Sequence, residues 1–251
     1  MPRDVYLALG DSITFGYNAT RPENAYAVLV HRHLQRLTGG SRARPVGRVV
    51  LAQHLWTASR LLWAARMLPQ TVWRRAGWAT VMIGGNDLRK LLRRQYLPPP
   101  LSTITEEHVH RRIAAFEQAY RPLCRLLRDA DIPRVVVCTM YNPAPNEPLA
   151  VDGIGRLNQV IRGCAEEFGF EVADIHTAFE GREADWIDHY RSGRLEDLIS
   201  PIRRPIHPND AGHAAIARCI VERLEPEARR RRNATPPGAP RRRRALHNNP
   251  R

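Results

Sequence analysis

Three polar side chains in this sequence are of the types that acyl transfer requires. Ser12 lies in GDSITFG, Asn86 lies in GGND, and His207 lies in IHPND. A serine can act as a nucleophile, a histidine can take its proton, and a side-chain amide can donate to a developing oxyanion. The three residues are far apart in the chain, so they can cooperate only if the fold brings them together.

Short apolar runs alternate with helical patterns along the chain, and this alternation predicts how those side chains are positioned. Near-continuous apolar runs are typical of strands covered on both faces. Strand–helix alternation predicts an α/β fold with a parallel sheet and helices on both faces, with ligands bound beyond the carboxyl ends of the strands. Ser12 and Asn86 directly follow two of the predicted strands, and His207 precedes the last helix. The predicted strands are 5–9, 48–52, 79–83, 134–140 and 170–175.

Each motif also has a plain structural explanation. Gly-Asp-Ser and Gly-Gly-Asn-Asp are ordinary turn sequences. His-Pro-Asn-Asp is typical of a helix start, with Pro208 in the first turn and Asn209 or Asp210 as the cap. The occurrence of all three motifs at one predicted sheet edge favours the catalytic interpretation.

Three segments of the chain resemble a known family. LALGDSITFG, VMIGGNDL and IHPNDAGHAAIA resemble the first, third and fifth blocks of the SGNH hydrolases, also called GDSL esterases and lipases, across roughly residues 5–224. The resemblance implies a flavodoxin-like three-layer α/β/α fold that hydrolyses carboxylic esters or acetyl groups without a cofactor. It implies that Ser12 is the nucleophile and His207 the base. It also implies that the Ser12 backbone amide and Asn86 are oxyanion donors, with Gly85 supporting the same site.

The sequence departs from the family pattern at Leu55. The second block of the family usually supplies a glycine whose backbone N–H is a further oxyanion donor. LAQHLWTASRLL is the best match to that block, and it places Leu55 at the glycine position. Leucine retains the N–H, but its side chain can narrow the pocket or oppose the dihedral angles that glycine adopts. The role of Leu55 as a donor is therefore an open question.

A second departure concerns the acid that orients the histidine. The family acid usually lies three residues before the histidine, sometimes two, and these positions hold Arg204 and Pro205. Three accounts remain open. A backbone carbonyl can hold the ring in a Ser12–His207 dyad, or an upstream carboxylate such as Asp197 can reach it. Alternatively, the enzyme is impaired and the fold is retained for binding.

The formal charge of +14 is concentrated at the end of the chain. Residues 226–251 contain nine arginines and one glutamate, so they contribute +8. Such a segment has little apolar surface to offset its ordering entropy and is predicted to be disordered. We therefore expect a hydrolase domain over 1–225 and an Arg-rich tail over 226–251. On the binding-protein alternative, this tail would hold nucleic acid or an anionic membrane.

Metal ions and cofactors are not expected. The four cysteines lack metal-ligand spacing, and the pairs at 31–33 and 108–110 lie in arginine-rich helical stretches without carboxylate or thiolate partners nearby. The sequence begins almost directly with a strand and contains no apolar run of membrane-spanning length, which predicts a cytoplasmic protein. The favoured function is serine-dependent hydrolysis of a small-molecule, lipid or sugar ester.

Overall fold

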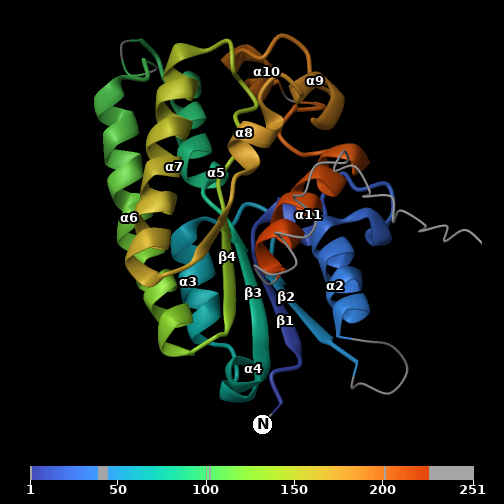
Figure 1. Ribbon diagram of the computed structural model, residues 1–251. Coiled ribbons are helices and arrows are strands. Elements are labelled where there is room, and N and C mark those ends of the chain that lie inside the picture. Colours follow the sequence, from blue (N-terminus) through green and yellow to red (C-terminus); the bar gives the residue numbers. More distant parts are fainter. Residues whose placement is uncertain (1, 39–44, 100, 102, 201, 226–251) are drawn as a thin grey trace, which may run out of the picture.

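Five parallel strands form one sheet in the order β2-β1-β3-β4-β5, which confirms the predicted α/β fold (Figure 1). This computed structural model describes residues 2–38, 45–99, 101, 103–200 and 202–225. The predicted tail over 226–251 therefore lies outside the described residues. The strands are β1 (Val5–Gly10), β2 (Gly47–Ala52), β3 (Ala76–Met82), β4 (Arg134–Cys138) and β5 (Glu171–Ala173).

Helices cover both faces of the sheet (Figure 1). On one face α2 (Tyr26–Leu37) packs against α11 (Asp210–Leu224), and on the other α6 (Glu106–Asp129) packs against α3 (Ala58–Arg66) and α7 (Pro148–Phe168). No helix in the described ranges is long and apolar enough to span a membrane. The shorter helices are α1 (Ser12–Phe15), α4 (Gln70–Arg75), α5 (Gly85–Arg89), α8 (Ile175–Phe179), α9 (Glu183–Trp186) and α10 (Leu195–Ile199), with 3₁₀ turns η1 (Pro22–Asn24) and η3 (Lys90–Tyr96).

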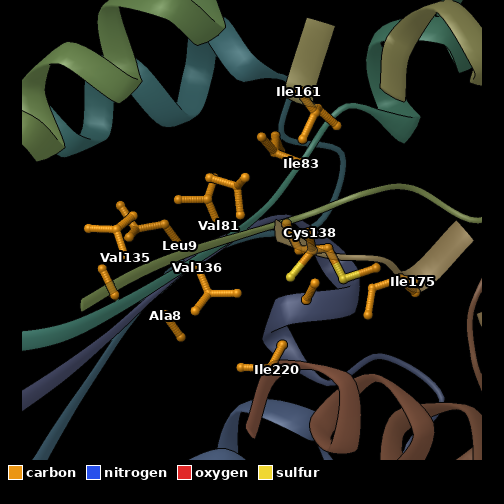
Figure 2. Close-up of a cluster of buried hydrophobic side chains, with 14 of the residues drawn as sticks. Ala8, Leu9, Val81, Ile83, Val135, Val136, Cys138, Ile161, Ile175 and Ile220 are labelled. Carbon is orange, nitrogen blue, oxygen red and sulfur yellow. The ribbon is translucent and has the colours of Figure 1, made fainter. Parts of the chain in front are cut away.

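Alternating side chains of the strands form the core on both faces of the sheet. In Figure 2, Val81 and Ile83 lie on the side of Ile161 from α7, whereas Ala8 and Val136 lie on the side of Ile220 from α11. All of these side chains are buried. The central strands are therefore covered on both faces, as their near-continuous apolar sequence predicted.

The prediction that strands are covered on both faces is wrong for β2. Its side chains alternate between half-buried and exposed, and Val50 is exposed. The reason is its place in the sheet, since among the described residues β2 lies at the edge and pairs with β1 alone.

Two predicted strands are shorter than the apolar runs indicated. The run 134–140 ends as a strand at Cys138, because the backbone of Met140 bonds with a side chain instead of a neighbouring strand. Met140 N donates to Asn158 Oδ1 at 2.7 Å, and Asn158 Nδ2 donates to Met140 O at 2.9 Å. The run 170–175 ends as a strand at Ala173, because Asp174 caps α8 through Thr177 N.

Candidate active site

Ser12 lies at the carboxyl end of β1, as the sequence predicted. It is the first residue of α1, and the Asp11 carboxylate caps this helix by accepting from Ile13 N at 3.0 Å. The backbone N–H of a first helical residue has no partner within its helix. Ser12 is 5% exposed. The site thus presents a nearly buried hydroxyl beside a backbone donor.

His207 contacts Ser12 directly, with 2.9 Å between His207 Nε2 and Ser12 Oγ. The loop that carries His207 is fixed on both sides. The Tyr141 hydroxyl donates to Ile206 O at 2.5 Å, and Asp188 N donates to His207 O at 2.9 Å. The structure therefore brings together two residues that are 195 positions apart.

Aromatic rings pack around the His207 imidazole. The Tyr17 ring centroid lies 4.6 Å from that of His207, and the His54 ring stacks on Tyr17 at 5.0 Å. Behind them, Tyr26 N donates to Nδ1 of the buried His213. His213 therefore carries its proton on Nε2, which donates to Tyr17 O at 3.1 Å. His213 fixes the backbone of Tyr17, whose ring in turn packs on His207.

The charges around His207 oppose its protonation. Burial, and after it the neighbouring His54, Arg89 and His213, together lower the pKa of His207 to about 4. Each of these three neighbours is cationic or becomes so when protonated. The His207 imidazole is consequently neutral at physiological pH, in an environment that does not stabilise the imidazolium.

No carboxylate bonds to the His207 ring within the described part of the chain, where its one hydrogen bond is to Ser12. The Asp197 carboxylate accepts instead from Ser192 N and Gly193 N, at 2.7 and 3.0 Å, which fixes a turn. Asp188, which lies beside His207 in the backbone pairing, accepts from Asn18 Nδ2 at 2.6 Å. The carboxylates of Asp197 and Asp188 are therefore engaged elsewhere.

Asn86 lies beside Ser12 on α5, the short helix that follows β3. Its Nδ2 donates to Trp56 O at 3.0 Å and makes a long 3.5 Å contact with Asp11 Oδ2, while Arg89 Nε donates to Asn86 Oδ1. These bonds fix the orientation of the amide. The long contact leaves one amide hydrogen weakly engaged, so it is available to a developing oxyanion.

Two glycines, Gly84 and Gly85, connect the end of β3 to Asn86. Gly84 has a φ of 134°, in a region that favours glycine, and an added Cβ would lie 2.9 Å from Leu157. Gly85 is the first residue of α5 and lines the pocket beside Ser12. Its own backbone N–H is therefore free of a partner within the helix.

Leu55 adopts the backbone conformation that glycine usually takes, with a φ of 65°. Its side chain is 49% exposed, so it points away from the core. The segment is held to α5 by two bonds, from Asn86 Nδ2 to Trp56 O and from Ala58 N to the Asp87 carboxylate at 3.1 Å. Leu55 thus adopts a left-handed conformation despite its side chain, and the bonds of the neighbouring residues to α5 hold the segment in place.

Replacing Leu55 by glycine should relieve backbone strain. A left-handed residue with a side chain costs about 1–2 kcal/mol, and the greater freedom of glycine when unfolded offsets part of this. We expect Leu55→Gly to raise the free energy of unfolding by about 0.5–1 kcal/mol in urea titrations, with activity retained. Leu55→Ala is the matched control, because it shortens the side chain and keeps the strain. An equal gain in both variants would contradict this explanation.

A largely apolar pocket with a cavity volume of about 120 Å³ opens beside Ser12 and His207. Its walls come from η3, from the segment after β4, and from α6, α7 and α10. We call it the apolar pocket. Aliphatic side chains form most of its lining, among them Leu88, Leu91, Met140, Leu149, Ile154 and Leu198.

The sequence did not predict some of the residues that surround His207. Nothing in their local sequence distinguishes Tyr17, His54 or Arg89 as neighbours of His207, because their proximity depends on loops folding over the sheet edge. His213 did carry a signal, since it lies in the same motif as His207, but its role appears only from its bonds to Tyr17 and Tyr26. In the described ranges, no group of three or more His, Cys, Asp or Glu side chains is placed to hold a metal ion.

Comparison with known proteins agrees with this geometry. The model of the GDSL-like Lipase/Acylhydrolase family matches residues 8–215. The chain belongs to this family. Membership assigns this GDSL hydrolase to the carboxylic ester hydrolases, and it confirms the resemblance of the three sequence blocks. No curated protein sequence gives a significant match.

Solved structures share the same α/β/α fold. A lipase from a goat rumen metagenome is 22% identical, with a TM-score of 0.67 over 86% of this chain and 94% of its own. The acetylxylan esterase Axe2 from Geobacillus stearothermophilus is 22% identical, with a TM-score of 0.58 over 88% and 94%. An alpha/beta hydrolase from the metagenome of Lake Arreo is 20% identical, with a TM-score of 0.53 over 87% and 93%.

Proposed function

We propose that this GDSL hydrolase cleaves esters through an acyl-enzyme on Ser12. The observation that carries the proposal is the 2.9 Å contact between Ser12 Oγ and His207 Nε2. His207 takes the hydroxyl proton as Oγ attacks the ester carbonyl, and it returns that proton to the departing alkoxide. Water, deprotonated by His207, then attacks the acyl-enzyme and releases the carboxylic acid and free Ser12.

The oxyanion of each tetrahedral intermediate faces preformed donors. The Asn86 amide and the Ser12 backbone N–H supply two of them, and the Leu55 N–H is a third in our proposal. Gly85, which has no side chain, lets the backbone before Asn86 line the pocket beside Ser12. Such donors stabilise charge that develops only near the transition state, so they lower the barrier more than they strengthen substrate binding.

His207 works in a dyad in this proposal, without an orienting carboxylate. Its ring is held by contact with Tyr17, and its loop by the bonds at Ile206 and His207 O. Asp197 supports the turn at Ser192 and Gly193 instead of acting as the acid. The alternative of an impaired, purely binding protein is disfavoured by the direct contact between nucleophile and base.

The acid limit of activity should lie at unusually low pH. The neutral form of His207 is the active base, and its pKa is lowered to about 4 by burial and by its cationic neighbours. We therefore expect kcat/KM to stay level as the pH falls from 7 and to decline only near about pH 4. His54→Gln removes one repulsive neighbour and should shift this limit toward higher pH.

This measurement needs a control for unfolding at low pH. Because the pKa of His207 is lower when folded than its ordinary 6.5, the folded state binds fewer protons than the unfolded state between about pH 6.5 and 4. Folding stability therefore decreases as the pH falls through that window, and circular dichroism should accompany each rate. An acid limit near pH 6.5 in a folded enzyme would contradict the assignment.

The apolar pocket is the site for the acyl chain in this proposal. Each buried CH₂ contributes about 0.8 kcal/mol, so kcat/KM should rise by up to roughly fourfold per methylene until the chain fills the pocket. The test is a series of p-nitrophenyl esters from acetyl to decanoyl. Acetyl esters should be the poorest substrates.

Gly153→Leu supplies a matched variant for this series. Gly153 lines the apolar pocket, and an added Cβ meets only ordinary contacts, at 3.5 Å from Val109 and 3.6 Å from Leu88. The larger side chain should reduce activity on octanoyl and decanoyl esters and spare the acetyl ester. A wild type that prefers acetyl esters would contradict an acyl role for this pocket.

A further inference from the structure

A second pocket, rich in cationic side chains, adjoins the catalytic residues. Its cavity volume is about 350 Å³ and it opens to solvent, and we call it the basic pocket. The apolar and basic pockets share Asn86 and Arg89 in their walls, so they meet at the candidate oxyanion site. The cationic lining of the basic pocket consists of Arg89, Lys90, Arg93 and Arg204, with His54 beside them.

The cations of the basic pocket outnumber the carboxylates that act on them, which are Asp11 near Arg89 and Asp87 near Lys90. Across the residues that the structure describes, none of these four cations forms an ion pair, whereas arginines elsewhere do, such as Arg75 with Asp4 and Arg156 with Asp152. The pKa of Arg89 is lowered by burial and then by the charges of Arg204 and Arg93, which shows that the cluster repels itself.

The geometry of the basic pocket leaves donors free for a ligand. The Arg89 Nε donates to Asn86 Oδ1, and Arg204 Nε donates to Ser200 O at 2.5 Å. The terminal guanidinium nitrogens of both residues make no protein hydrogen bond within the described ranges. Guanidinium N–H groups match the oxygen spacing of phosphate and bind it through paired, charge-assisted bonds.

We infer that the substrate is an ester whose acyl chain occupies the apolar pocket and whose alcohol part carries a phosphate that binds in the basic pocket. This inference rests on the proposed function and names its substrate class. A neutral alcohol would leave four clustered cations without an ion-pair partner, whereas a phosphate monoester, with a charge of about −1.5 to −2 at pH 7, offsets up to about half of their charge. The ester carbonyl then lies where the two pockets meet, beside Asn86.

The test compares 1-octanoylglycerol with 1-octanoylglycerol 3-phosphate, which share the scissile ester and the acyl chain. Both are used as monomers below their micellar concentrations. We expect kcat/KM to be on the order of tenfold or more higher for the phosphorylated substrate, with the preference declining as salt rises. Glycerol 3-phosphate should inhibit hydrolysis of the neutral ester competitively, and glycerol should not.

Variants of the basic pocket identify the cause of this preference. Arg93→Gln and Arg204→Gln should each reduce kcat/KM for the phosphorylated ester several-fold, with little change for the neutral ester. Arg66→Gln is the matched control, because Arg66 is equally charged, exposed and remote from both pockets. It should leave the preference unchanged.

The outcomes separate the inference from the proposed function. Equal kcat/KM on both esters, abolished by Ser12→Ala, would overturn the phosphate inference and leave the Ser12 mechanism standing. Hydrolysis that survives Ser12→Ala would overturn the proposed function. A preference lost equally in Arg66→Gln would show a general charge effect and would also overturn the basic pocket as the phosphate site.

Discussion

Ser12→Ala should lower kcat by about 10⁵–10⁶-fold, because removal of a serine nucleophile leaves only binding and oxyanion stabilisation. The variant loses one hydroxyl and its bond to His207, so the fold should be retained. Circular dichroism and melting temperature check the fold, and initial rates on an octanoyl ester measure the loss. Ser59→Ala is the matched control, since Ser59 is exposed and its one side-chain hydrogen bond within the described ranges is to Thr57.

A double variant of Ser12 and His207 tests whether the two residues act together. A nucleophile and its base act as a unit, so their losses should not add. We expect His207→Gln to cost about as much as Ser12→Ala, and the double variant to be no slower than either single variant. Additive losses would show that the two residues act independently, which is incompatible with the proposed dyad.

Asn86→Ala has the second largest expected effect, a decrease in kcat of roughly 10²–10³-fold. The amide is held by bonds to Trp56 and Arg89, so it is preorganised for charge that appears only near the transition state. The KM should change much less than kcat. Steady-state kinetics across the acyl series measure both constants.

The control for Asn86→Ala separates catalysis from loop support. Asn146→Ala removes an exposed amide that bonds to Ser192 O, and it should leave kcat unchanged. If Asn86→Ala raised KM and left kcat unchanged, Asn86 would position substrate and would not be an oxyanion donor. Loss of the folded state in Asn86→Ala alone would be revealed by its melting curve.

Much of the site could be predicted because it depends on topology. Parallel strands with their carboxyl ends at one edge must deliver the residues that follow them to that edge, and Ser12 and Asn86 follow β1 and β3 directly. The motif before the last helix brought His207 to the same place. These inferences need only the order of elements and the side-chain types.

Other features of the site depend on packing between distant loops, and no local pattern reveals them. Tyr17 contacts His207 only because His213 fixes its backbone from α11. The positive φ of Leu55 is imposed by bonds to α5 against the preference of leucine, so its residue type was misleading there. Likewise, Arg89 and Arg204 line one pocket, which the sequence did not predict: Arg204 was notable only for its place three residues before His207, and Arg89 was not distinguished from the other arginines.

The proposed dyad also has a kinetic consequence. In a complete triad, loss of the orienting carboxylate can cost about 10⁴-fold, and here the surroundings of His207 are cationic. The enzyme should therefore turn over more slowly than a triad hydrolase on the same activated ester. In return, the proposed base, His207, remains neutral and able to accept a proton at acidic pH.

The most direct test of the central claim is covalent labelling with a fluorophosphonate, read by intact mass and peptide mapping. The proposed acyl-enzyme mechanism predicts one adduct per chain, located on Ser12, that is absent in Ser12→Ala and forms far more slowly in His207→Gln. An adduct on another serine, with hydrolysis retained in Ser12→Ala, would contradict it.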